Sequence, residues 1–321
     1  MKLHIMIFIL FNCSIVYCGT FNQFKKKVID IDSYSFAPTK RWVTINKDET
    51  KSIERLISLL KKSKTGRKIL IKSSKKALEE GKLLVHLFKA GEGSLLDTTL
   101  VRRFSRSNPD QIMYENKSTI YINKEHTILN AVLDMAHELT HFTFRKPFNP
   151  YVGNFTPDQF VKSTVEGLGG EVDAYLIECR VLYELFPTSA RSVSNCEKVR
   201  DSKTGKFSKK LGVKQFYKVG RHVRTYMEEL SFFKLSSNKF PYLSSRTATF
   251  ISSAWGLPYP LAALKEYKTI MGKVCHNDHK RLVLMKGNVS RAPASMLQGE
   301  SSKKRYDSFS KNYHNRCQQF I

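Results

Sequence analysis

A chain of 321 residues, with 41% hydrophobic and 12% aromatic side chains, is long and apolar enough to bury a core, which excludes a disordered protein. Its 54 lysines and arginines stand against 28 aspartates and glutamates, a formal net charge of +26. This excess of cations favours contact with anionic envelope polymers, acidic lipid head groups or nucleic acid, without choosing among them. A solvated basic surface with no partner is the alternative.

Residues 1–18 have the layout of a secretory signal peptide. A basic start precedes the apolar stretch LHIMIFILFNCSIV, and small residues follow in YCGT. The apolar stretch is too short and too interrupted by polar residues to predict a spanning helix. We therefore expect an exported protein, periplasmic or extracellular, that is not integral to the membrane once the leader is removed. A lipid anchor on Cys18 is the less favoured alternative, because the bulky Tyr17 precedes it.

The cysteines that remain after the leader are Cys179, Cys196, Cys275 and Cys317. An even number of cysteines in an exported chain suggests disulfides, and four cysteines allow three pairings. The most local pairing is Cys179–Cys196 with Cys275–Cys317. In CHNDH (275–279), Cys275 and the two histidines are an alternative metal site, which the exported context disfavours.

The first half of the mature chain divides into a lysine-rich region and the start of a core. We expect residues 19–110 to pack on a catalytic domain, with helical patterns in ETKSIERLISLLKKS and SKKALEEGKLLVHLFKAG. STIYINK (118–124) alternates and is rich in β-branched residues, which predicts a strand. HTILNAVLDMAHELTHF follows with helical spacing, Thr127 as a candidate N-cap and Pro147 and Pro150 beyond its end.

A second helix is predicted from TPDQ to ECRVLYELFP, with Thr156 as N-cap and Gln159 completing a capping box. Glycines that would each cost about 1 kcal/mol in a helix interrupt it at Gly167, Gly169 and Gly170. Either another backbone approaches closely there, or the helix breaks.

Further helices are predicted in QFYKVGRHVRTYMEELSFFKL and LAALKEYKTIMGKV, after a lysine-rich loop at 197–214. Residues 287–321 are expected to form a basic, polar tail, irregular or extended. These elements predict the α+β class: a mainly helical catalytic domain at 111–286 with a small sheet beside its central helix.

DMAHELTHFTF (134–144) carries the chemistry. His137 and His141 stand four apart, so on a helix they project from one face and can bind one zinc ion, which prefers imidazole nitrogens and carboxylate oxygens. Glu138 lies about 100° around the helix from His137, where it would flank the metal and take a proton from a metal-bound water. An ordinary helix with two polar histidines is the alternative, since HExxH arises by chance on the order of once per hundred sequences.

HELTH on a helix directly after a strand resembles the zincin metallopeptidases, over residues 118–180. The resemblance implies that STIYINK is an edge strand that binds peptide in extended form. The metzincin branch would require a glycine at 144 and a histidine at 147, where this chain has Phe144 and Pro147. The gluzincin branch takes a glutamate from a later helix, followed three residues on by alanine.

GGEVDAY offers Glu171 followed by Ala174, so the resemblance implies Glu171 as third ligand. Glu166, which Gly169 follows at the same spacing, is the alternative. Asp134, one turn before His137, is a candidate to orient that ring. Tyr226 and His222 are conceivable transition-state donors that nothing in the sequence selects.

The resulting hypothesis is an exported Zn2+-dependent peptidase acting on proteins or peptides. His137, His141 and Glu171 hold the metal, and Glu138 is the general base. The alternative is a non-enzymatic, basic envelope protein that binds anionic polymers, with the HExxH helix structural. The charge also allows the peptidase itself to be held at an anionic envelope surface, and no specific nucleic-acid partner is predicted.

Overall fold

The computed structural model describes residues 40–104, 112–146, 148–151, 155–185, 194–291 and 297–320. The expected leader, the Cys18 anchor and Pro147 lie outside these ranges. Within them the protein is mostly helical and contains a small three-stranded sheet, which confirms the α+β class. None of the helices in the described ranges is both long and apolar enough to cross a bilayer.

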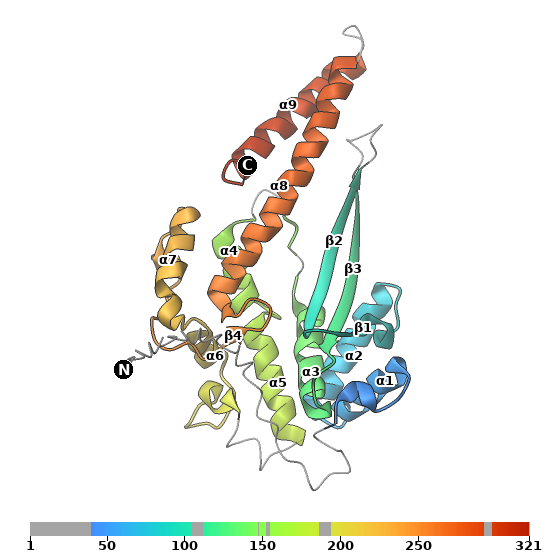
Figure 1. Cartoon of the computed structure of the whole chain (residues 1–321), viewed down its shortest axis with the longest axis vertical. Helices are drawn as coiled ribbons and strands as arrows, with labels where there is room; N and C mark the ends of the chain where they lie inside the picture. The colour runs from blue at the N-terminus through green and yellow to red at the C-terminus, as the bar shows by residue number, and fades with distance from the viewer. Residues whose placement is uncertain are drawn as a thin grey trace, which may run out of the picture.

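The central helix, α3 (Ile128–Phe144), is covered on one side by α1 (Glu49–Leu60) and α2 (Lys64–Glu79) (Figure 1). The helical pattern expected in ETKSIERLISLLKKS is confirmed by α1, which buries Ile53 and Leu56. SKKALEEGKLLVHLFKAG, in contrast, holds only the end of α2 before a short 3₁₀ turn and a strand.

The sheet has the order β1-β3-β2, formed by β1 (Phe88–Gly91), β2 (Leu95–Phe104) and β3 (Ile112–Asn123). STIYINK lies in β3, so the predicted strand is confirmed, but its expected position at an edge is wrong. β3 pairs antiparallel with β2 and, from Ile120 onward, parallel with β1. From Ile120 to Asn123, β3 is therefore the middle strand, whereas residues 112–119 pair with β2 alone; β1 and β2 both come from the region before residue 110.

The second predicted helix is two helices, α4 (Pro157–Val165) and α5 (Glu171–Leu185), which meet at the three glycines. Thr156 precedes α4, but its side chain makes no capping bond, and its hydroxyl has no partner among the described residues. The predicted capping box is therefore wrong. Pro157 removes the first of the unpaired N–H groups at the start of α4, but it leaves those of the second and third residues, which an N-cap side chain would serve.

The remaining chain wraps the far side of α5. QFYKVGRHVRTYMEELSFFKL divides between α6 (Lys209–Phe216) and α7 (Val223–Phe232), with a turn between them. The elements after α5 are α6 (Lys209–Phe216), α7 (Val223–Phe232), β4 (Ile251–Ser252), β5 (Leu257–Pro258), α8 (Tyr259–Arg291) and α9 (Leu297–Cys317). The 3₁₀ turns are Trp42–Thr44, Leu84–Leu87, Asn195–Val199, Gly220–His222 and Ser237–Lys239.

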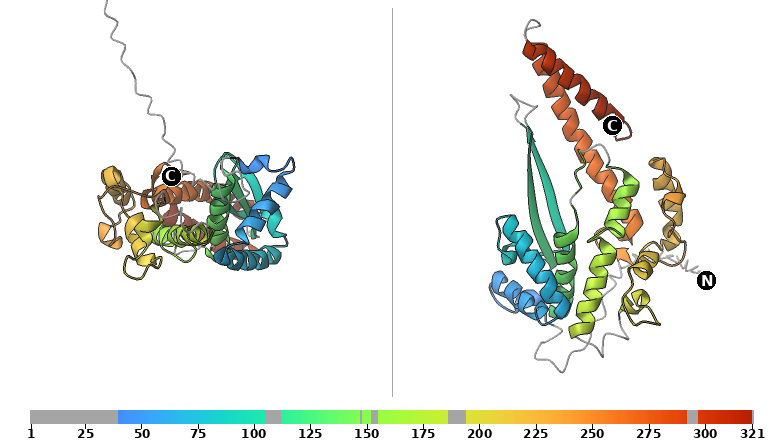
Figure 2. Two further views of the ribbon diagram at one scale, coloured as in Figure 1. Left: turned by 90° about the horizontal axis from the view of Figure 1, so that it is seen from below. Right: turned by 180° about the vertical axis from the view of Figure 1, so that it is seen from behind.

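The expectation of an irregular C-terminal tail from residue 287 is wrong. α8 continues to Arg291, and α9 folds back along it (Figure 2). The tail is polar along much of its length, yet Cys317 is bonded to Cys275, and Tyr313 is buried against α8. Arg316 also pairs with the buried Asp278. Tertiary contacts thus hold a helix that its own composition does not predict.

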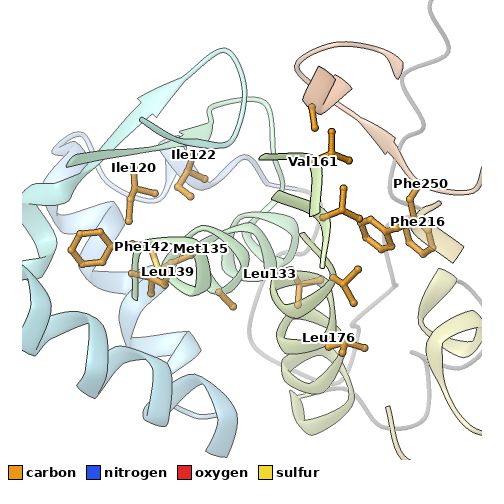
Figure 3. Packing of buried hydrophobic residues seen from close by; sticks show 14 of the residues in the cluster. Ile120, Ile122, Leu133, Met135, Leu139, Phe142, Val161, Leu176, Phe216 and Phe250 are labelled. Carbon is orange, nitrogen blue, oxygen red and sulfur yellow. The ribbon is translucent and has the colours of Figure 1, made fainter. Parts of the chain in front are cut away.

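The core lies on both sides of α3 (Figure 3). Ile120, Ile122, Leu139 and Phe142 pack between α3 and the sheet side, whereas Val161, Leu176, Phe216 and Phe250 lie toward α5 and beyond. A helix buried on nearly all sides can hold a polar side chain only where another element supplies partners. For α3 that element is α5.

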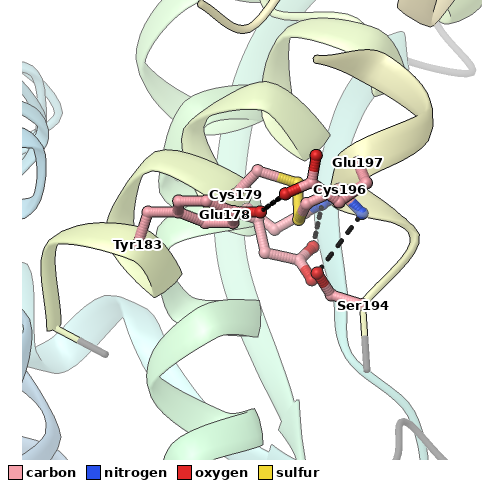
Figure 4. The surroundings of a disulfide bond; sticks show 7 residues. Glu178, Cys179, Tyr183, Ser194, Cys196 and Glu197 are labelled. Carbon is pink, nitrogen blue, oxygen red and sulfur yellow. Dashed lines mark hydrogen bonds and ion pairs between the residues drawn. A yellow bond between two sulfur atoms is a disulfide. The ribbon is translucent and has the colours of Figure 1, made fainter. Parts of the chain in front are cut away.

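Both disulfides have the predicted local pairing, Cys179–Cys196 and Cys275–Cys317. The first joins α5 to the 3₁₀ turn at Asn195–Val199, beside Glu178 (Figure 4). Two disulfides are compatible with an exported protein, because thiols are kept reduced in the cytosol of most cells.

Candidate metal centre

α3 positions the two histidines. It begins after Thr127, whose hydroxyl accepts a hydrogen bond from the Asn130 N–H, so the predicted N-cap is confirmed. His137 and His141 lie one turn apart with their ring centroids 4.8 Å from each other. His141 is buried and His137 nearly so. The pair is therefore held inside the protein at the contact between α3 and α5.

Glu171, the first residue of α5, reaches both rings. Its Oε2 lies 3.3 Å from His137 Nε2 and its Oε1 lies 3.5 Å from His141 Nε2. One ligand atom from each of the three residues lies within 4.8 Å of the others. In the described part of the chain, this is the one group of at least three such residues close enough to share an ion.

The second nitrogen of each ring faces a different acceptor. His137 Nδ1 lies 3.3 Å from Glu178 Oε2, and His141 Nδ1 donates to the backbone oxygen of Gly169 at 2.7 Å. Metal-binding histidines usually donate one N–H to a carboxylate or carbonyl in this way, which fixes the ring and leaves the other nitrogen for the ion. Two Nε2 atoms and one carboxylate are a donor set that suits zinc.

Gly169 explains why the helix breaks before α5. Its φ of +68° is in the left-handed region, and a Cβ there would lie 2.5 Å from the backbone nitrogen of Arg145. Both alternatives predicted for the three glycines are therefore confirmed: the helix breaks there, and another backbone approaches closely. The bend at Gly169 brings its carbonyl oxygen to His141. It also places Glu171, the first residue of α5, beside the rings of His137 and His141.

The local electrostatics favour positive charge at this place. Burial works to lower the pKa of His137, but Glu171 and Glu178 outweigh it and raise that pKa well above its ordinary value. Burial works to raise the pKa of Glu171, but the two histidines outweigh it and hold the pKa below its ordinary range. A cation between these groups would therefore meet a site that already compensates positive charge.

Glu138 is only 6% exposed and sits directly after the first ligand candidate. Burial raises its pKa above the ordinary carboxyl value, while the charges of His141 and His137 act in the opposite direction. A raised pKa makes this carboxylate a better proton acceptor, as a general base requires.

Two other residues that the sequence suggested for the site bind different partners in the structure. Glu166, the alternative third ligand, accepts a hydrogen bond from the Tyr217 hydroxyl at 3.1 Å. Asp134 lies 2.8 Å from His126 Nε2, and the acceptor that faces His137 Nδ1 is Glu178. The orienting role considered for Asp134 is therefore wrong, because both nitrogens of His137 face carboxylates of α5 and Asp134 pairs with His126 in the loop before α3.

Neither conceivable donor belongs to the cluster. Tyr226 is fully buried with its ring against Phe240. Burial and the cations Arg221 and Lys265 lower the pKa of His222, and no carboxylate of the cluster acts on it. The sequence reasoning missed Tyr259, the first residue of α8. Burial raises the pKa of Tyr259 well above its ordinary value, and the negative charges of Glu171 and Glu138 raise it further.

Glu178 was missed although a signal existed. It follows Glu171 by seven residues, which is two helical turns, so both carboxylates share one face of α5. Tyr259 had no comparable signal, because only the tertiary fold brings the start of α8 near the α3–α5 contact.

The alternative metal site in CHNDH does not form. Cys275 is in a disulfide, Asp278 pairs with Arg316, and His279 lies 3.3 Å from the Tyr313 hydroxyl. The segment serves the contact between α8 and α9.

No family model, curated protein sequence or solved structure matches this chain. Function therefore has to be inferred from the cluster of His137, His141 and Glu171 itself.

Proposed function

We propose that the protein is an exported zinc-dependent metallopeptidase in which His137, His141 and Glu171 hold the ion. One observation carries the proposal: both Nε2 atoms face the same carboxylate, while both Nδ1 atoms face a separate protein acceptor. An accidental pair of helix histidines has no reason to satisfy all four nitrogens in this ordered way.

Bound zinc would supply Lewis acidity, which polarises a peptide carbonyl and lowers the pKa of water. Glu138 would accept the proton of the attacking water on its carboxylate and then give it to the leaving amine. Glu178 and the Gly169 carbonyl would keep the two rings oriented. We assign the Tyr259 hydroxyl as the hydrogen-bond donor to the carbonyl oxygen of the substrate, since this half-buried residue packs on Phe216 and the negative charges of Glu171 and Glu138 raise its pKa.

The test combines metal analysis with peptide cleavage for the purified protein and three variants. Glu138→Gln should keep stoichiometric zinc and lose cleavage by a factor of about 100 or more, the contribution expected of a general base. Glu171→Gln should lose both zinc and cleavage. Glu166→Gln, the matched control on the other side of the glycine break, should keep both.

Cleavage by Glu138→Gln at the wild-type rate, with zinc still bound, would show that the proposed mechanism is wrong. Absence of stoichiometric zinc and of cleavage in the wild type would instead favour the non-enzymatic, basic envelope protein. Loss of zinc in Glu166→Gln but not in Glu171→Gln would reassign the third ligand.

A further inference from the structure

The outward side of α2 presents a stripe of cations and large aliphatic side chains. The α2 stripe consists of Lys64, Lys68, Ile71, Lys75 and Leu78, all exposed. Their spacing of three or four residues places them along one side of the helix. The other side of α2 buries Ile69, Leu70 and Ala77.

Ile71 and Leu78 are among the most exposed large hydrophobic residues in the described part of the chain. They are 71% and 64% exposed, although α2 already has a full buried side. Single exposed aliphatic residues are common, but here two of them stand two turns apart on one side of a helix. Lys75 lies between them and Lys68 lies one turn before Ile71, so lysine and aliphatic side chains alternate along the stripe. Glu79, at the C-terminal end of the helix, is the nearest exposed acidic residue in α2.

Figure 1 and the left view of Figure 2 show α1 and α2 at one side of the molecule, opposite α6 and α7. The exposure of all five stripe residues shows that the stripe does not pack against another element of the described fold. α2 also packs directly on α3, and Lys76 donates to the backbone oxygen of Phe142 in that helix.

We propose that the α2 stripe is a docking surface for a lipid bilayer that contains anionic phospholipids. Interfacial helices insert aliphatic side chains to the depth of the head groups while lysines bind the phosphates around them. Lysine stems add apolar length below their charged ends, so alternating lysine and aliphatic residues suit this boundary.

Charge and composition favour a bilayer over other partners. A second copy of this chain would bring an equally cationic stripe against the first, and the two would repel each other. Single-stranded nucleic acid is bound through cations with aromatic rings, and the stripe has no aromatic residue. The +26 net charge of the chain attracts an anionic surface from a distance, and Ile71 and Leu78 then supply the short-range contact. This binding requires neither zinc nor catalysis.

The test is co-sedimentation of the purified full chain with phosphatidylcholine vesicles, with and without phosphatidylglycerol. The protein should sediment with the vesicles that contain phosphatidylglycerol. It should stay in the supernatant when the vesicles contain phosphatidylcholine alone. Ile71→Ser with Leu78→Ser should weaken that binding by a factor of about ten or more, since two partly inserted aliphatic side chains are lost. Lys68→Glu with Lys75→Glu should weaken it by a factor of about thirty or more, at roughly 1 kcal/mol for each lost cation.

Two matched controls keep the result specific to α2. Met227→Ser with Val283→Ser removes exposed apolar residues from α7 and α8, and Lys303→Glu with Lys304→Glu makes the same charge change on α9. Both controls should bind like the wild type. All variants carry the same N-terminal residues, so any contribution of those residues to binding is equal in each. Far-ultraviolet circular dichroism checks that each variant is folded.

Equal loss of binding in the α9 and α2 charge variants would overturn the proposal, because net charge alone would then explain binding. Unchanged binding by the Ile71 and Leu78 variant would also overturn it. Tighter binding of a DNA oligonucleotide than of the vesicles, unaffected by the two serines, would assign the stripe to a nucleic acid instead.

Discussion

At the scale of single residues, the candidate site depends on which nitrogen of each histidine is already in use. The Gly169 carbonyl takes the Nδ1–H of His141, and Glu178 faces Nδ1 of His137. The Gly169 carbonyl can only accept, so it fixes the His141 tautomer whose Nε2 keeps a free lone pair for an ion. His137 has a carboxylate at both nitrogens, so an ion would have to displace the proton that its Nε2 shares with Glu171. The site is therefore built as much by the partners of the histidines as by the histidines themselves.

Gly169→Ala should destabilise the protein by more than about 2 kcal/mol, because it combines the cost of a positive φ with a Cβ that lies 2.5 Å from Arg145 N. Gly81→Ala is the matched control. Gly81 has a similar φ of +72°, but a Cβ there would meet no atom within 4 Å. Urea unfolding of both variants measures the difference, and equal destabilisation would show that the close approach carries no cost.

Glu178→Gln should lower zinc affinity by a factor of about 10 to 100, since the carboxylate that orients His137 loses its charge. Competition with a chromogenic chelator measures the affinity. Glu197→Gln is the control, because Glu197 lies on the other side of the nearby disulfide and bonds to Tyr183 (Figure 4). The orienting role would be refuted if both variants bound zinc like the wild type.

At the scale of elements, α5 stabilises its neighbours at both ends. Its first residue faces α3, and near its last turn Glu184 accepts hydrogen bonds from the Ser63 hydroxyl at 2.6 Å and the Thr65 N–H at 2.7 Å. Those donors belong to the start of α2, where unpaired N–H groups and the helix dipole favour a negative charge. One helix therefore caps another that is more than a hundred residues away in the sequence.

Glu184→Gln should destabilise the protein by about 1 kcal/mol at neutral pH, as expected for a lost charged cap. Burial works to raise the pKa of Glu184, but hydrogen bonds from Ser63 and Thr65 outweigh it and lower the pKa below its ordinary value. A lowered pKa in the folded state means that this stabilisation is complete above the unfolded-state pKa of about 4.3 and is lost as the pH falls through the folded value.

Urea unfolding of wild type and Glu184→Gln should therefore show a difference at pH 7 that shrinks below about pH 4. Glu79→Gln, at the opposite end of α2, should be neutral or slightly stabilising at both pH values, because an acidic residue near a helix C-terminus is unfavourable. A difference for Glu184→Gln that persists unchanged in acid would contradict the charged cap.

At the scale of the whole molecule, α3 divides the core, with the sheet, α1 and α2 on one side and α5 with the later helices on the other (Figure 3). The candidate ligands come from both α3 and α5. An ion held there would connect the two sides of the core and would bind the folded state alone, because unfolding separates the ligands.

Zinc at about a hundred times its dissociation constant should therefore stabilise the folded protein by about 2.7 kcal/mol, and the Tm should rise by roughly 5 °C or more. Differential scanning calorimetry with added zinc and with a chelator measures the change. The Tm of Glu171→Gln should not respond to either. A wild-type Tm that is the same under both conditions would exclude a zinc site of useful affinity.

The local features of the chain could be predicted because their causes lie within a few residues. Thr127 caps α3, apolar spacing forms α1 and α3, and HELTH places two histidines on one side of a helix. The pairing of the cysteines followed from their nearness in sequence. The strand in STIYINK was also correct, since alternation is a property of the segment itself.

The errors concern position among other elements. Alternation in β3 cannot reveal that β1 and β2 flank it on both sides, and a polar composition cannot reveal that α9 is held on α8 by Cys317 and Tyr313. The sequence by itself determined which side chains can bind a metal and on which helix they stand. The tertiary structure alone decided that Glu178 faces His137 and that Glu166 bonds to Tyr217 instead, because contacts between distant segments depend on how the whole chain packs.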